Sequence, residues 1–358
     1  MNRFITLLFS VILFDLMLGG GGRLVAWGGV TLRMILFSLA LIAVGVQTLR
    51  KQKISREYWL ITFAFAGIVL IGLAIGLLAG ASRVYWWEDV KPLLYFFMLP
   101  FFGFAIQGRN TVELTARIIK LTGIILSSVF IILLILINTG TIPFLDFYNT
   151  VIGTQEFFFR GELTFFYKGF IYICIAFLFI HFSEDKYKYF VLILLAIGIL
   201  LSFTRGFLFA IMLTYAFYFL LKSSFTKPAI FVILSLSVVL FGQWAISKGS
   251  QAIDQIKNQQ SHDIKSNPNS NLLGNRSYSD DGRLQQIKEV EGQINLVSFL
   301  IGHGFGVGIP SRPVHMEISY LEIFHKQGLI GLGFWAYLLW MLYLKYKHAV
   351  PGQLSDSF

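Results

Sequence analysis

Charged residues are scarce in this sequence. Asp, Glu, Lys and Arg make up 13% of its 358 residues, whereas an ordinary soluble domain carries roughly 25%. So few charges cannot cover a water-facing surface, and hydrophobic residues reach 56% of the chain. The composition therefore excludes an ordinary soluble enzyme and predicts a membrane protein.

Cysteine is almost absent as well. The single Cys174 lies inside an apolar run, so neither an internal disulfide nor a Cys-rich metal site is possible. The sequence also lacks a signal-peptide cleavage pattern, because Gly19–Gly22 stand where an A-x-A motif would follow the first apolar segment. We therefore expect that segment to be retained as a helix.

What the sequence does have is a series of long apolar runs. Crossing the hydrocarbon layer takes roughly 20 such residues in a helix. The runs predict about ten transmembrane helices, at residues 4–18, 32–49, 59–80, 91–107, 118–138, 168–183, 189–203, 206–221, 228–246 and 329–345. Lys91 and Pro92 open the fourth of these, Pro100 interrupts it, and a polar half-helix precedes the last. The predicted fold class is an all-α polytopic membrane protein with one large periplasmic loop.

The positive charges give the predicted orientation. With the N-terminus in the cytoplasm, the internal ends of the spans carry twice as many Lys and Arg residues as the short external loops. We therefore place both termini inside and the spanless segment outside. The predicted organisation is a membrane part at 1–246, a periplasmic loop at 247–316, and at 317–358 a half-helix, the last span and a cytoplasmic tail.

The external loop divides into two parts. Residues 254–281 are rich in Asn, Ser, Gln, Lys and Asp, which predicts a flexible polar segment. Between residues 283 and 294, apolar side chains recur at helical spacing, namely Leu284, Ile287, Val290 and Ile294. This pattern predicts a short amphipathic helix lying on the membrane surface.

Two arginines are candidates for binding an anion on the external side. Arg205 lies in the short turn between the seventh and eighth spans, and Arg283 stands at the head of the predicted amphipathic helix. A guanidinium can hold a phosphate through two parallel hydrogen bonds. The alternatives are that Arg205 reaches out to lipid headgroups and that Arg283 pairs with a neighbouring aspartate.

His315 is the candidate general base. Its unperturbed pKa suits proton abstraction near neutral pH. If His315 opens a helix, Ser319 and Glu322 fall on the same face, so a carboxylate lies two turns away. The alternative is a surface histidine in a loop. His303 is a weaker candidate, because its glycine neighbours predict a tight turn.

Three other features carry weaker predictions. Asp280 and Asp281 offer metal ligands, although such a pair in a polar loop is usually solvated. Asp15 lies within the first span, where an interhelical hydrogen bond is the favoured explanation. The aromatic tract at 156–160 and 165–167 is typical of a membrane interface, with sugar stacking as the alternative.

In their order along the chain, these features resemble the O-antigen polymerase and O-antigen ligase superfamily of bacterial envelope glycosyltransferases. The similarity covers roughly residues 190–345. It comprises a Ser-x-x-Arg-Gly turn at Arg205, Arg283 heading a helix, a Gly-His-Gly-x-Gly run from Gly302, a His-x-x-x-x-Tyr-Leu-Glu segment from His315, and Gly-Leu-Ile-Gly from Gly328. The sequence departs from the family at Thr204, where serine is common, and at Met316, where asparagine is common.

The resemblance implies an inverting, metal-independent transfer with no cofactor. It implies that Arg205 and Arg283 bind the pyrophosphate of an undecaprenyl-diphosphate-linked oligosaccharide. His315 would deprotonate the acceptor hydroxyl, and no metal ligands are expected. The partners would be the lipid-linked donor, a glycan acceptor on a lipid carrier, the bilayer of the inner membrane and a chain-length regulator, with no nucleic acid.

Within that family, the short chain favours a polymerase, which uses a second lipid-linked oligosaccharide as acceptor. The alternative is a ligase, which transfers the glycan to the lipid A core. A transporter of the same lipid is a third hypothesis. It would require charges inside the helix bundle, and the predicted spans contain almost none apart from Asp15.

Overall fold

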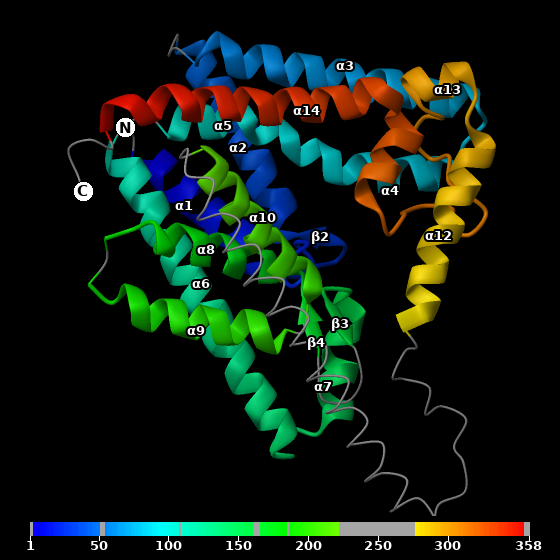
Figure 1. The fold of residues 1–358 in the computed structure, drawn as a ribbon. Coiled ribbons are helices and arrows are strands. Elements are labelled where there is room, and N and C mark those ends of the chain that lie inside the picture. The colour runs from blue at the N-terminus through cyan, green and yellow to red at the C-terminus, as the bar shows by residue number, and fades with distance from the viewer. Residues whose placement is uncertain are drawn as a thin grey trace, which may run out of the picture. The chain divides into compact units, whose positions relative to one another are not determined.

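The computed structural model describes residues 3–50, 54–106, 109–159, 165–184, 186–202, 204–221 and 276–353 (Figure 1). Helices dominate these residues, and the named strands among them form two short hairpins. The chain divides into two compact units. The first comprises Met1–Leu36 with Gln107–Gly274, and the second comprises Phe37–Ile106 with Asn275–Phe358.

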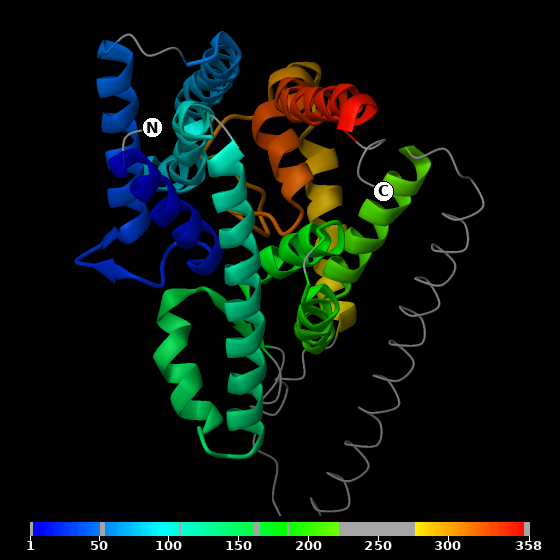
Figure 2. The same cartoon turned by 90° about the vertical axis from the view of Figure 1, so that its left-hand side faces the viewer.

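The first unit is a group of helices around the long helix α6. Its elements are α1 (Arg3–Leu18), β1 (Ala26–Trp27), β2 (Val30–Thr31), the start of α2 (Leu32–Leu49), α6 (Arg109–Asn138), α7 (Phe144–Val151), η2 (Ile152–Thr154), β3 (Phe157–Phe159), β4 (Phe165–Tyr167), η3 (Lys168–Phe170), α8 (Ile171–His181), α9 (Lys188–Leu201) and α10 (Arg205–Leu221). Figure 2 shows α7 running back beside the end of α6.

Small residues let α6, α8 and α9 approach closely, as is common between helices in membranes. A Cβ atom added to Gly123 would lie 2.4 Å from Cβ of Ala176. Gly198 lies against Ser127, whose Oγ donates a hydrogen bond to the Leu194 carbonyl at 2.8 Å. The serine hydroxyl is thus satisfied within the apolar interior.

Asp15 makes the interhelical hydrogen bond that the sequence predicted. Nε of Arg33 in α2 donates to Oδ2 of Asp15 in α1 at 2.9 Å. The same guanidinium also donates to the carbonyls of Asp15 and Gly20. These bonds neutralise and satisfy the aspartate, so its position within α1 has a structural explanation.

The aromatic tract forms the hairpin of β3 and β4. Phe165 and Tyr167 are buried in the core of the first unit, whereas Phe158 is half exposed. Phe158 stacks on Phe166 across the hairpin with ring centroids 5.8 Å apart. Much of the described tract therefore belongs to the core. For the exposed surface at Phe158, contact with the membrane interface or with a sugar ring stays a prediction.

Beyond residues 37–49 of α2, the second unit comprises α3 (Arg56–Leu78), α4 (Arg83–Leu94), η1 (Tyr95–Met98), α5 (Leu99–Ala105), α12 (Arg276–Gln293), α13 (Leu296–Ile301) and α14 (Ser319–Gln353). Its aromatic core brings Phe65 of α3 against Phe334 and Trp335 of α14. Phe305, from the loop before α14, is buried in the same cluster. The core thus ties the loop and the last helix to α3.

The fourth predicted span, 91–107, is wrong as a single helix. The structure has α4, the 3-10 turn η1 and α5 in its place, and α4 already begins at Arg83. Pro92 lies in the last turn of α4, and Pro100 stands in the first turn of α5. Proline lacks the backbone N–H that a continuous helix needs, and it is well tolerated where a helix begins.

The last helix is also divided, as the sequence predicted. Gly328 has φ 63° and ψ −159°, which breaks α14 between a polar half-helix at 319–327 and an apolar part from 329 onward. The polar part carries Glu322 and Lys326.

The predicted amphipathic helix exists as α12, but it begins at Arg276, so Arg283 lies within the helix and not at its head as expected. Its apolar residues also differ in burial. Val290 is buried against Ile309 and Met316, whereas Leu284, Ile287 and Ile294 are exposed. Gln286 is buried as well. Its Oε1 accepts a hydrogen bond from the backbone N–H of Glu317 at 3.0 Å, which satisfies this oxygen in the buried position. Contact of the exposed apolar residues with the membrane surface stays a prediction.

Four helices in the described part of the chain are long and apolar enough to cross a membrane: Leu32–Leu49, Arg56–Leu78, Asn110–Asn138 and Ser319–Lys345. Shorter apolar helices lie at other predicted spans, namely Lys168–His181, Lys188–Leu201 and Gly206–Tyr215. The predicted span at 228–246 and the polar loop up to residue 275 lie outside the described residues. The protein is thus a mostly helical membrane protein, and the total of ten spans stays a prediction.

The loop at residues 302–306, here called the glycine loop, fastens the second unit together. Its five consecutive backbone N–H groups all donate hydrogen bonds: Gly302 to Ser298 O, His303 to His325 O, Gly304 to Lys326 O, Phe305 to Gly72 O and Gly306 to Asp89 Oδ2, at distances from 2.7 to 3.1 Å. The bonds to His325 and Lys326 satisfy carbonyls where the half-helix ends. α3, α4, α13 and α14 therefore all meet at this loop.

Glycine is required at three positions of this loop for two reasons. Gly302, Gly304 and Gly306 have φ values of 79°, 85° and 81°, which other residues rarely adopt. The loop also lies directly on α3, so that a Cβ atom added to Gly304 would lie 2.2 Å from the backbone nitrogen of Gly76.

We expect Gly304→Ala to destabilise the protein by at least about 1–3 kcal/mol, because the new residue keeps a strained φ and collides with backbone. The midpoint of thermal unfolding in detergent, followed by tryptophan fluorescence, measures this. Gly292→Ala in α12 is the control, because its added Cβ meets nothing within 4 Å. Equal unfolding midpoints for the two variants would contradict the packing of the loop on α3.

Candidate active site

His315 lies in the irregular segment between the glycine loop and α14. The predicted helix does not start there, since α14 begins at Ser319. The predicted carboxylate is nevertheless in contact: Nδ1 of His315 lies 3.2 Å from Oε1 of Glu322. Oδ1 of Asp89, from α4, lies 3.8 Å from the same nitrogen.

This arrangement fixes the imidazole for proton transfer. With Nδ1 turned toward carboxylates, Nε2 is the nitrogen left to meet a substrate. The side chain is 53% exposed, so a substrate group can reach it. The hydrogen bond to Glu322 raises the pKa of His315 above its usual value by stabilising the imidazolium. A histidine backed by a carboxylate is an arrangement suited to a general base.

Lys326 lies behind this pair and is almost entirely buried. Its Nζ donates to Oδ1 of Asp89, Oε1 of Glu322 and the carbonyl of Val314, each at 2.6 Å. Only 3% of its side chain is exposed, against 2% for Asp89. Oδ2 of Asp89 accepts the N–H of Gly306 at 2.7 Å. The three charged groups and the glycine loop thus form one polar network, buried at Asp89 and Lys326 and partly exposed at Glu322, that ends at His315.

Arg283 belongs to the same unit and lies near this network through Glu317, two residues after His315. Nε of Arg283 lies 3.4 Å from Oε2 of Glu317, and Arg312 pairs with the other carboxylate oxygen. Both arginines are about half exposed. Arg283 therefore has an ion-pair partner, Glu317, that lies far from it in the sequence. The partly exposed pair of guanidinium groups is suited to an anionic ligand.

A short turn holds Arg312 in place. Ile309 and Arg312 exchange backbone hydrogen bonds at 3.1 and 2.9 Å. Within the turn, the N–H and hydroxyl of Ser311 both donate to Oε2 of Glu289 in α12, at 3.0 and 2.7 Å. The helix that carries Arg283 is therefore also the one that positions Arg312.

Arg205 is the first residue of α10 and belongs to the first unit. The predicted short turn is present, because α9 ends at Leu201 and α10 starts four residues later. Ser202 is buried there, and its hydroxyl donates to the Ile199 carbonyl at 2.7 Å. The side chain of Arg205 lies outside what the structure describes, so its meeting with Arg283 and His315 stays a prediction.

The remaining candidates take other places. His303 uses its backbone N–H to cap the half-helix, and its ring packs on that of His325 with centroids 4.6 Å apart. Asp281 lies in α12, and the side chain of Asp280 is outside the described residues. Among described side chains, Asp89, His315 and Glu322 have the spacing of a metal site.

Three residues of the candidate site were missed by sequence reasoning: Asp89, Lys326 and Arg312. Asp89 is more than 200 positions from His315, and nothing local links them. Lys326 had a usable signal, because it follows Glu322 by four residues and thus shares its helix face. Its burial depends on the glycine loop and could not be read from spacing.

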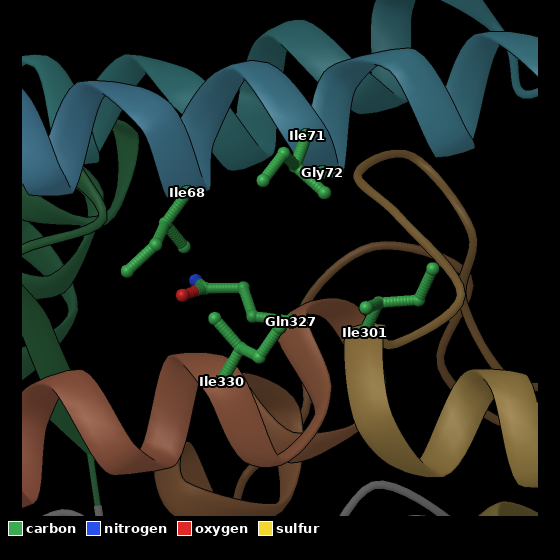
Figure 3. Close-up of a pocket in the computed structure, with 6 residues that line it drawn as sticks. All are labelled: Ile68, Ile71, Gly72, Ile301, Gln327 and Ile330. Carbon is green, nitrogen blue, oxygen red and sulfur yellow. The ribbon is translucent and has the colours of Figure 1, made fainter.

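A small pocket lies next to the glycine loop, between α3 and α14. Its wall consists of Ile68, Ile71, Gly72, Ile301, Gln327 and Ile330. Figure 3 shows the Gln327 amide projecting between isoleucine side chains of the two helices. None of the six residues is ionisable, so this pocket offers no group for acid–base chemistry or for holding a diphosphate.

Comparison with known proteins agrees with the motifs. A family model described as O-antigen ligase matches residues 190–336. An "O-antigen polymerase" from Shigella flexneri is 30% identical over 345 residues, covering 93% of this chain and 80% of that protein. No solved structure matches significantly.

The family match spans α9, α10, the glycine loop, His315 and the first part of α14. The polymerase relative extends the similarity over nearly the whole sequence. The chain therefore belongs to the O-antigen polymerase and ligase family of bacterial envelope glycosyltransferases.

Proposed function

We propose that this protein is an O-antigen polymerase, which joins undecaprenyl-diphosphate-linked oligosaccharides on the periplasmic face of the inner membrane. The observation that carries the chemistry is the contact of His315 with Glu322, at 3.2 Å. The polymerase relative, similar over 80% of its length, favours this product over that of a ligase.

In the proposed reaction, Nε2 of His315 takes the proton of an acceptor sugar hydroxyl. The hydroxyl oxygen attacks the anomeric carbon of the donor as the bond to the diphosphate breaks, which inverts the configuration there. Glu322 accepts a hydrogen bond from Nδ1–H and stabilises the imidazolium that forms. No step of this scheme calls for a metal ion.

The leaving diphosphate gains negative charge in the transition state. Cations fixed beside it therefore stabilise that state more than the ground state. Arg283 and Arg205 take this role in the proposal. Arg283 is supported by its position on α12, linked through Glu317 to the segment that carries His315. Removing such a donor commonly lowers the rate by about 10²–10³-fold.

The topology supports a site outside the cytoplasm. Contacts in the second unit join residues that the charge count had placed on the same side: Asp89 with His315, predicted external, and Glu57 with Lys345, predicted cytoplasmic. Ten spans with both termini inside complete the proposal. The donor and acceptor would both be lipid-linked glycans, and a chain-length regulator is the expected protein partner.

A gel of the lipopolysaccharide from a deletion strain tests this function. Reintroducing the wild-type gene should restore long O-antigen chains, whereas His315→Ala should leave the core capped with a single repeat, because the acceptor hydroxyl is not deprotonated. His181→Ala is the histidine control, since that ring packs on Phe182 and Tyr215 in the other unit.

The pattern of bands decides between the candidates. A bare core with lipid-linked chains accumulating would indicate a ligase instead. Repeat units that build up on the cytoplasmic side would indicate a transporter. Full-length chains from a folded His315→Ala protein would remove His315 as the base.

The pH dependence of transfer follows from the charges around His315, which are Glu322 and Lys326 of α14 and Asp89 of α4. The base must be neutral, so kcat/KM falls as the pH drops through the pKa of His315 in the free enzyme. Glu322→Gln removes the main cause of the raised pKa. We therefore expect kcat/KM of Glu322→Gln to fall at a lower pH than that of the wild type. We also expect its plateau value of kcat/KM to be reduced by about 10–100-fold, because the imidazole of His315 is no longer oriented.

This prediction is checked by kcat/KM profiles of the purified enzyme in detergent. Glu57→Gln is the matched control, because that carboxylate is exposed and pairs with Lys345. An acid limb that stays in place in Glu322→Gln would show that the titrating base is another group.

A further inference from the structure

Three groups around His315 have the chemistry and spacing of a metal site. Asp89, His315 and Glu322 each offer a ligand atom, and these atoms lie within 4.8 Å of one another. Carboxylate oxygens and imidazole nitrogens of this kind hold zinc and related divalent cations in many proteins. A catalytic role for a metal would therefore be a natural reading of the triad.

A cation already lies between two of these groups, the carboxylates of Asp89 and Glu322. Nζ of Lys326 lies 2.6 Å from Oδ1 of Asp89 and 2.6 Å from Oε1 of Glu322. A divalent metal on these two oxygens would sit roughly 2.0–2.2 Å from each, in the volume that the ammonium fills. Two like charges cannot share that place.

Lys326 is also fixed there. An ammonium has three donors, and all three are used, since the third meets the Val314 carbonyl at 2.6 Å. With 3% of its side chain exposed, the lysine has little room to swing aside. Lys326 is also linked to His315 in two ways: it donates to the backbone carbonyl of Val314, the preceding residue, and to Glu322, which contacts the imidazole.

We propose that Lys326 is a built-in replacement for a divalent cation, and that its charge positions His315. Two carboxylates this close without a cation would share a proton. Glu322 would then no longer serve as a full acceptor for Nδ1–H of His315. Lys326 favours the ionised form of both carboxylates and, through its bond to Oε1 of Glu322, sets the imidazole. It is a positioning residue, and its role in transfer rests on the proposed function.

Cobalt(II) is a suitable probe, because Co²⁺ held by nitrogen and oxygen ligands in a tetrahedral protein site gives a visible band much stronger than the weak absorption of free aqueous Co²⁺. Lys326→Ala removes the ammonium and opens its space, whereas Lys326→Met removes the charge but keeps the space filled. In purified protein in detergent, we expect no Co²⁺ band for the wild type, one for Lys326→Ala, and none for Lys326→Met. Adding Glu322→Gln to Lys326→Ala should abolish the band.

Transfer activity gives the second measurement. We expect a drop of about 10–100-fold in Lys326→Met, the size found when a hydrogen-bonding partner that orients a metal-ligating side chain is lost. Wild-type transfer should be unchanged by a chelator. Lys345→Ala is the matched control and should alter neither readout, because that lysine is half exposed and pairs with Glu57.

Either of two spectroscopic results would overturn the proposal: a wild-type Co²⁺ band that disappears in His315→Ala, or a folded Lys326→Ala protein without a band. If Lys326→Ala does not fold, the proposal is tested by the Co²⁺ titration of the wild type and by the transfer activity of Lys326→Met. Full transfer activity in Lys326→Met would refute the proposal. A failure of this proposal can be distinguished from a failure of the proposed function, because the Co²⁺ spectra do not depend on sugar transfer.

Discussion

The second unit depends on one constraint, which is that backbone polar groups need partners where water is excluded. The glycine loop enters the packed region between α3 and α14 and brings five N–H groups with it. Each finds an acceptor, including the Gly72 carbonyl within α3 and the Asp89 carboxylate. The positive φ values of the three glycines allow the turn, and the absence of their side chains allows the close approach.

Satisfying these groups also builds the site. The bond from Gly306 fixes Asp89, which receives Lys326, and Lys326 in turn holds Glu322 and the backbone before His315. A buried network of this kind is stable only when every member is paired. The exposed imidazole is thus the outer end of a chain of contacts that begins at the backbone of the loop.

Much of this could be predicted from the sequence, where local patterns decide. Apolar runs located α1, α2, α3, α6 and the helices near α9, and Gly-Leu-Ile-Gly marked the break in α14. The pairing of His315 with Glu322 followed from a spacing of seven residues, although the helix starts later than assumed. By contrast, Asp89 and Arg312 join the site through tertiary contacts, which spacing does not encode. The prediction of the fourth span as one helix was wrong. Its prolines indicate that a continuous helix is weakened, but they do not fix where one helix ends and the next begins.

The break at Gly328 has a mechanical consequence. An apolar helix adjusts its tilt to the thickness of the bilayer around it. An unbroken α14 of 35 residues would carry that tilt directly to Glu322 and Lys326. Because the helix is interrupted at Gly328 and the polar half is tied to the glycine loop, we expect tilting of the apolar half to be absorbed at the break. We therefore expect the position of the histidine to be insulated from changes in lipid composition.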